Sequence, residues 1–98
     1  MNMKEAARVA KQHVKDLFGS EQISNLGLEE VEFDEHSMIW NVTIGFSRPW
    51  DTPSNAFEAI AQRVSSPKRS YKVVRIDDAS GKVRSVKNRE TESWAESA

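Results

Sequence analysis

The sequence predicts a small α+β domain in which one N-terminal helix covers one face of a four-stranded antiparallel meander. Three observations predict this fold class: an amphipathic stripe over residues 3–18, an alternating pair of strands over residues 28–47, and a β-hairpin over residues 71–87. A chain of 98 residues has room for one core. We therefore expect one domain over residues 1–88 and a mobile tail over residues 89–98, where one tryptophan stands among charged residues.

The first element is a helix over residues 3–18. Its apolar side chains recur at helical spacing, while most lysines and arginines lie elsewhere on the wheel. The predicted buried stripe consists of Met3, Ala6, Ala7, Ala10, Val14, Leu17 and Phe18. Gly19 follows directly, where a left-handed helix cap is common, so the helix is expected to end at Phe18.

Two strands follow the helix. Residues 22–27 are expected to form a loop, since they mix Ser24, Asn25 and Gly27 with two apolar residues. Residues 28–34 then alternate between apolar and acidic side chains, and residues 38–47 alternate more clearly. In the second strand the inward residues are Trp40, Val42, Ile44 and Phe46, and the outward ones are Asn41, Thr43, Gly45 and Ser47. Its large inward residues predict a central strand against the helix.

Between the second and third strands, Pro49 and Pro53 interrupt the sheet because proline lacks a backbone donor. Thr52 is a candidate cap for a short second helix, in which apolar residues recur at helical spacing up to Val64. A polar loop over residues 65–70 leads to the final hairpin. There, residues 78–81 read as a type I turn closed by Gly81 in the left-handed region.

The final hairpin resembles the closing hairpin of PepSY-type small domains, in which a tyrosine and a valine precede the turn and a glycine and a valine follow it. The matching residues here are Tyr71, Val73, Gly81 and Val83. The sequence from Trp40 to Ile44 resembles the preceding strand of such domains, and residues 5–18 resemble their opening helix. The resemblance implies a cystatin-like fold and a non-enzymatic role in binding or inhibiting a partner such as a peptidase. It transfers no functional residue.

The composition narrows the range of functions. Without cysteine there is neither a disulfide framework nor a thiolate metal site, and no apolar run approaches the length of a membrane span. No signal-like apolar region is present near Met1. We therefore expect a cytoplasmic protein with no membrane association and no cofactor.

Opposite charges are segregated along a chain whose net charge is −1. Residues 21–35 contain six acids and no lysine or arginine, whereas residues 63–89 are rich in both bases. One interpretation, which we favour, is that acidic and basic strands are neighbours and pair across the sheet. The other is that the basic half forms a patch for an acidic partner or for nucleic acid.

No catalytic or metal-binding set stands out. His13 is expected at the boundary of the helix stripe, and His36 in an exposed turn. Trp50 is the most suggestive single residue, because an aromatic ring between two prolines is a rigid anchor for a partner, although packing over the core edge is an equal alternative. The candidate partner-binding residues are Arg48, Trp50, Phe57, Lys68, Arg69 and Tyr71.

The function expected from these features is that of a protein-binding or regulatory module without catalytic activity. Its partner would be another protein or a second copy of this chain, and a homodimer would form through the open sheet face or the edge of the last strand. The alternative is nucleic-acid binding through the last two strands, with Lys68, Arg69, Lys72, Arg75, Arg84 and Lys87 as phosphate contacts and Tyr71 as a stacking platform.

Overall fold

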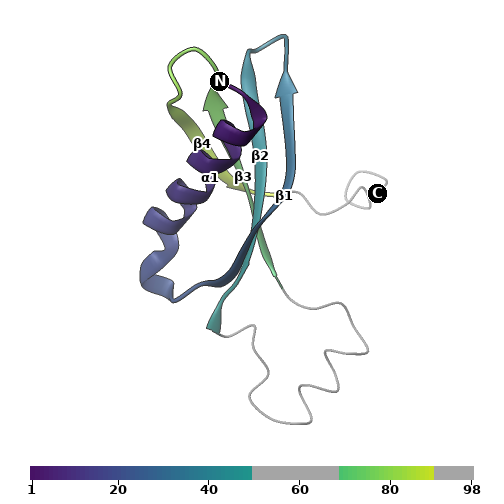
Figure 1. Ribbon diagram of the computed structural model, residues 1–98. Helices are drawn as coiled ribbons and strands as arrows, with labels where there is room; N and C mark the ends of the chain where they lie inside the picture. Colours follow the sequence, from purple (N-terminus) through teal and green to yellow (C-terminus); the bar gives the residue numbers. More distant parts are fainter. Residues whose placement is uncertain (50–68, 90–98) are drawn as a thin grey trace, which may run out of the picture.

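The computed structural model describes residues 1–49 and 69–89, which form one helix lying across one face of a four-stranded antiparallel sheet (Figure 1). The strand order is β1-β2-β3-β4, so each strand pairs with its neighbours in sequence. This confirms the predicted α+β fold and its meander. The expected short second helix lies outside the described residues. The elements are α1 (Met3–Phe18), the 3-10 helix η1 (Gly19–Glu21), β1 (Ser24–Asp34), β2 (Ile39–Ser47), β3 (Ser70–Asp77) and β4 (Val83–Asn88).

Helix α1 begins with a side-chain cap. The Asn2 side-chain oxygen accepts a hydrogen bond of 2.8 Å from the backbone N–H of Glu5, which satisfies one of the free donors of the first turn. Ala6, Ala10 and Val14 are fully buried against the sheet. Two small alanines at this interface let the helix backbone approach the strands closely.

The predicted stripe of α1 is too long at both ends. Met3 and Leu17 are 59% and 52% exposed, although both were expected in the core. They lie in the first and last turns, outside the buried middle of the helix. At the last turn it is Phe18 that packs on the sheet, with its ring centroid 5.4 Å from that of Phe46.

The expected left-handed cap at Gly19 is also wrong. Gly19 has φ −59°, so the backbone continues into η1, and Gln22 is the left-handed residue with φ 56°. The backbone N–H of Gln22 donates to the Gly19 carbonyl, which closes this extra turn. A glycine directly after an amphipathic stripe therefore marked the end of α1 but not the reversal of the chain.

Strand β1 starts earlier than expected. Residues 24–27 were predicted as loop, but they pair with the end of β2 through Ser24–Ser47 and Gly27–Gly45. Two irregularities interrupt this pairing, one between Ser24 and Gly27 and one between Leu28 and Glu30. Such bulges break the strict alternation from which a strand is recognised in sequence. Ile23 and Leu26, the two apolar residues of the predicted loop, pack on the core.

Strand β2 is central, and its inward residues form the middle of the core. Trp40 is 7% exposed, while Val42, Ile44 and Phe46 are fully buried, as predicted. The opposite side of β2 is less open than expected, because Thr43 is only 3% exposed and Gly45 is buried. The strand therefore has little contact with water on either face.

The β3–β4 hairpin turns through Gly81, whose φ of +73° confirms the predicted left-handed position. The role expected of Asp78, however, belongs to Asp77. The Asp77 carboxylate accepts hydrogen bonds from the backbone N–H and the hydroxyl of Ser80. Asp78 instead accepts a 2.8 Å hydrogen bond from the Trp40 indole N–H. The turn is thus attached to the core through a tryptophan.

No helix in the described part of the chain has both the length and the apolar character needed to cross a membrane.

Candidate binding face of the sheet

The structure describes three of the six predicted site residues, and it brings only Arg69 and Tyr71 to the same face of the sheet. Arg48 packs on the α1 side of the sheet, whereas Arg69 and Tyr71 belong to the opposite side. Trp50, Phe57 and Lys68 lie outside the described residues. The predicted site is therefore divided between two faces of the sheet.

The sheet face opposite α1, which we call the outer face, carries a regular arrangement of charge. Alternate residues of each strand point to it, because the intervening ones form the core under α1. In one cross-strand row, Glu30 of β1 pairs with Thr43, Thr43 with Val73, and Val73 with Lys87 of β4. This row has an acid at one edge, a base at the other, and two short uncharged side chains between them.

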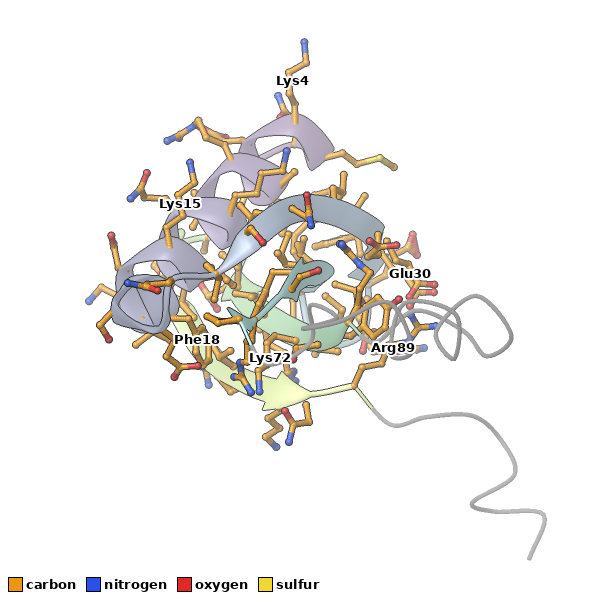
Figure 2. The ribbon with its side chains drawn as sticks, turned by 90° about the horizontal axis from the view of Figure 1, so that it is seen from below. Lys4, Lys15, Phe18, Glu30, Lys72 and Arg89 are labelled. Atoms are coloured by element: carbon orange, nitrogen blue, oxygen red, sulfur yellow. The ribbon has the colours of Figure 1, made fainter. Side chains whose placement is uncertain are left out.

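The next row of the outer face also starts with an acid on β1, but its base lies on β3 and its β4 edge is a serine. Glu32 pairs with Asn41, Asn41 with Arg75, and Arg75 with Ser85. The acids thus form a column along β1, and the bases form a column along β3 and β4. Figure 2 shows the two sides of the sheet: Glu30 and Arg89 lie on one side, and Phe18 and Lys72 lie on the side of α1.

At one point the two charge columns are joined. Arg69, just before β3, reaches over β2 to Glu29, with 3.2 Å between Nη2 and Oε2, and the same nitrogen donates to the Asn25 carbonyl at 3.0 Å. Gly45 leaves the space for this contact. A Cβ at Gly45 would lie 2.8 Å from both the Arg69 nitrogen and the Glu29 oxygen.

Elsewhere on the outer face the charges remain apart. Among the described residues, Glu30, Glu32, Arg75 and Lys87 take part in none of the ion pairs. With β2 between them, β1 and β3 are two strand spacings apart, about 9.5 Å. β1 and β4 are three spacings apart, about 14 Å. In the rows next to Gly45, the side chains of Asn41 and Thr43 occupy the space over β2 that is open at Gly45. The favoured expectation that acidic and basic strands are neighbours is therefore wrong: β2 lies between them.

Tyr71 lies on the same outer face, in the row of Gly45. The Arg89 guanidinium carbon lies 5.7 Å from its ring centroid, and the Arg89 backbone N–H donates to the Tyr71 carbonyl. The chain thus keeps its contact with the sheet at the first residue of the predicted tail. The tyrosine ring already has a cation on it, which occupies part of the proposed stacking platform.

A second cluster lies on the α1 side and includes Arg48. Its guanidinium carbon is 5.6 Å from the Phe18 ring centroid and 5.4 Å from that of Phe46, and its Nε is 3.0 Å from Glu21 Oε1. The Lys72 ammonium lies 5.2 Å from the Phe18 ring centroid. The two cations and Glu21 therefore surround the aromatic pair at the end of α1.

The electrostatics of this cluster are consistent with a packing role. Burial of the ammonium lowers the pKa of Lys72 below its ordinary 10.5, and the charge of Arg48 lowers it further, while Glu21 opposes that shift. Lys72 also donates a hydrogen bond to the Asn88 side chain. Arg48 and Lys72 thus contact Glu21, the two aromatic rings and the Asn88 amide. These contacts stabilise the end of the helix against the sheet.

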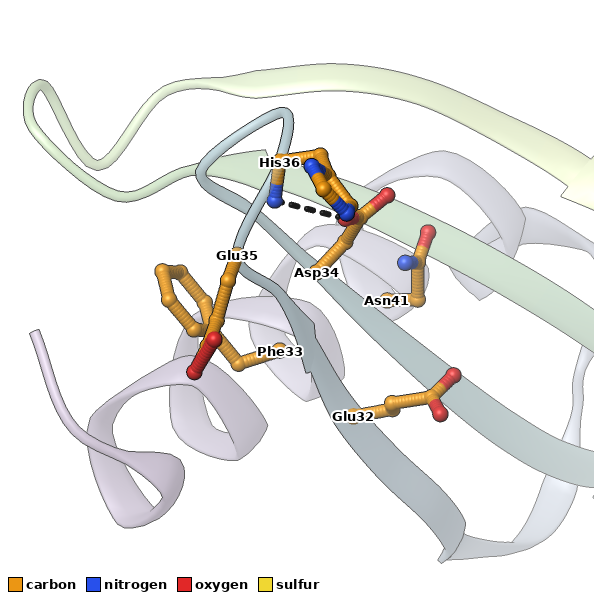
Figure 3. A pocket seen from close by; sticks show the side chains of 6 residues that line it. All are labelled: Glu32, Phe33, Asp34, Glu35, His36 and Asn41. Atoms are coloured by element: carbon orange, nitrogen blue, oxygen red, sulfur yellow. Dashed lines mark hydrogen bonds between the residues drawn. The ribbon is translucent and has the colours of Figure 1, made fainter.

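A hollow of about 460 Å³ lies around the β1–β2 turn (Figure 3). Its lining includes Glu32, Asp34, Glu35 and His36. Hydrogen bonds from the Ser37 side chain and the His36 backbone lower the pKa of Asp34, so this carboxyl stays ionised and is no proton donor near neutral pH. His36 is exposed, as predicted, and His13 is half-buried, as predicted.

The described residues contain no group of three metal-binding side chains close enough to hold an ion. The hollow at the turn therefore has neither a carboxyl with a raised pKa nor a set of metal ligands among the described residues.

The outer-face residues that were not predicted as site residues are Glu30 and Glu32, because their position across the sheet from the basic column depends on strand order. Their alternation with Val31 was the only available signal.

Comparisons of this chain with family models, with curated proteins and with solved structures give no match. The resemblance to PepSY-type domains therefore stays a prediction.

Proposed function

We propose that this chain is a protein-binding module without catalytic activity, which binds its partner through the outer face of the sheet. The observation that carries the proposal is the pair of separate charge columns, in which Glu30, Glu32, Arg75 and Lys87 have no ion-pair partner among the described residues. Charged side chains on such a face orient a partner and suppress wrong ones more than they stabilise the fold. The partner is a protein surface with bases facing β1 and acids facing β3 and β4.

Nucleic-acid binding is the weaker candidate. Tyr71, Arg75, Lys87 and Arg89 do lie on the same face, which supports it. The column of acids along β1 opposes it, because a phosphate backbone that crosses the sheet would meet Glu30 and Glu32. A net charge of −1 also gives no long-range attraction to a polyanion.

A photo-crosslinking experiment tests the proposal. A photoreactive phenylalanine analogue replaces Asn41, which lies between Glu32 and Arg75 on the outer face, and a control carries the analogue at Lys15, exposed on α1. We expect a discrete protein adduct from position 41 that is absent from position 15. The adduct should disappear when all four unpaired charges are neutralised (Glu30→Gln, Glu32→Gln, Arg75→Gln and Lys87→Gln).

Three outcomes would contradict the proposal: no protein adduct from position 41, the same adduct after the four charges are neutralised, or an adduct that nuclease treatment removes. The last outcome would favour the nucleic-acid alternative.

A further inference from the structure

The order of charges on the outer face is self-complementary. Two neighbouring rows start with an acid on β1 and have their base on β3 or β4: Glu30, Thr43, Val73, Lys87, and Glu32, Asn41, Arg75, Ser85. The row beyond them, Asp34, Ile39, Asp77, has an acid on both β1 and β3. A two-fold axis that runs along the strands, between two outer faces, places β1 of one copy opposite β4 of the other. Glu30 then faces Lys87 of the second copy, and the same contact recurs on the other side of the axis.

We infer that the partner of the outer face is a second copy of this chain, in a symmetric dimer whose axis is parallel to the strands. This inference rests on the proposed function, because it names the occupant of the same face. In this arrangement the acid and base columns meet twice, as the symmetry of an isologous interface requires. Glu32 approaches Arg75 of the second copy in the neighbouring row.

The charge pattern also selects this axis over the other two-fold arrangement. An axis across the strands would place β1 opposite β1, and so Glu30 and Glu32 against the same acids of the second copy. Like charges that face each other across an interface are unfavourable. Two sheets packed face to face keep their strands within about 30° of each other, so the axis along the strands is compatible with ordinary sheet packing.

Two further observations favour a second copy. Within the described residues β2 separates the two columns, and neither Glu30 nor Lys87 has an ion-pair partner there. The net charge of −1 means that two copies repel each other little as they approach. The exposed ends of the row, Glu30 and Lys87, give the interface its charged rim, while Val73 and the buried Thr43 lie near its centre.

Charge reversal with purified full-length chain tests the inference by sedimentation equilibrium. An acid-reversed variant carries Glu30→Lys and Glu32→Lys, and a base-reversed variant carries Arg75→Glu and Lys87→Glu. We expect wild type to dimerise and each variant alone to associate at least tenfold more weakly, since its columns then have the same sign. An equimolar mixture of the two variants should dimerise again, because both meeting columns have opposite signs in the mixed pair.

The matched control carries Lys4→Glu and Lys15→Glu on exposed positions of α1, which changes the net charge as much as the base-reversed variant does. It should dimerise like wild type. Circular dichroism establishes that each variant is folded, and recovery in the mixture independently excludes unfolding as the cause of a loss.

Several outcomes would overturn the inference: a monomeric wild type at low salt, dimers that survive both reversals, or reversed variants that do not associate when mixed. A monomeric wild type that still gives a charge-dependent adduct with a different protein from position 41 would refute the dimer alone. Absence of both dimer and adduct would refute the proposed function as well.

Discussion

At the scale of single residues, Trp40 links the core to the hairpin turn. Its ring lies 4.7 Å from that of Phe33, and its indole N–H donates to Asp78. The sequence predicted the burial of Trp40 from strand alternation. It did not predict the polar contact, because Asp78 is 38 positions away and looked like an ordinary turn residue.

The two roles of Trp40 can be separated by substitution. Trp40→Ala removes both and should cost about 3–5 kcal/mol, enough to threaten a domain of this size. Trp40→Phe keeps an aromatic ring against Phe33 and loses the indole donor, so it should cost about 1–2 kcal/mol. Urea unfolding measures both values. An unchanged midpoint for Trp40→Ala would show that the core is elsewhere.

Gly45 shows how one missing side chain determines which charges meet. The Arg69 side chain passes over β2 at Gly45 and reaches Glu29. No other ion pair among the described residues crosses β2 on this face. The sequence presents Gly45 only as a small residue at an outward position. Its significance depends on two side chains from distant parts of the chain.

A double-mutant cycle tests this role of Gly45. In wild type, Gly45→Ala should change stability little, because the higher strand propensity of alanine offsets the displaced ion pair. In an Arg69→Gln background the same change should stabilise by about 0.5–1 kcal/mol. A coupling energy near zero between the two positions would mean that Arg69 does not cross the strand there.

At the scale of elements, the sequence predicted what depends on local periodicity and missed what depends on irregularity. The amphipathic stripe gave α1, and alternation gave β2 and the hairpin. The first residues of β1 were predicted as loop because bulges interrupt their alternation. The left-handed residue after the helix is Gln22 and not Gly19, because the chain continues through η1. Both of these errors lie at an element boundary, where tertiary pairing outweighs local pattern.

The hairpin turn should depend on the ionisation of Asp77. Hydrogen bonds from Ser80, followed by the charge of Arg84, lower the pKa of this carboxyl below its ordinary 3.8. A carboxyl whose pKa is lower in the folded state contributes stability above about pH 4, and that contribution is lost as the pH falls through the folded value. Asp34, at the other turn, acts in the same direction.

We therefore expect Asp77→Asn to be less stable than wild type at pH 6, with a difference that shrinks as the pH is lowered from 4 to 2. Urea midpoints across this range provide the measurement, and Ser80→Ala, which removes one of the two donors, should show a smaller difference of the same sign. A difference between wild type and Asp77→Asn that is constant with pH would contradict this account.

At the scale of the whole molecule, strand order determines which charged side chains can pair with one another. The segregation of acids and bases was visible in the sequence, but its interpretation required the position of β2 between the two groups. The sequence predicted an open sheet face as a binding surface. It did not show which charges share a cross-strand row on that face, because this depends on the register between the strands.

The simple strand order also has a kinetic consequence. α1, β1 and β2 are consecutive, and β3 and β4 form a hairpin, so both parts consist of contacts between near neighbours in sequence. Only the pairing of β2 with β3 must close a long connection, residues 48–69. The entropy of closing such a connection rises by only about 0.6 kcal/mol for each doubling of its length. Lengthening this connection should therefore slow folding while altering equilibrium stability little.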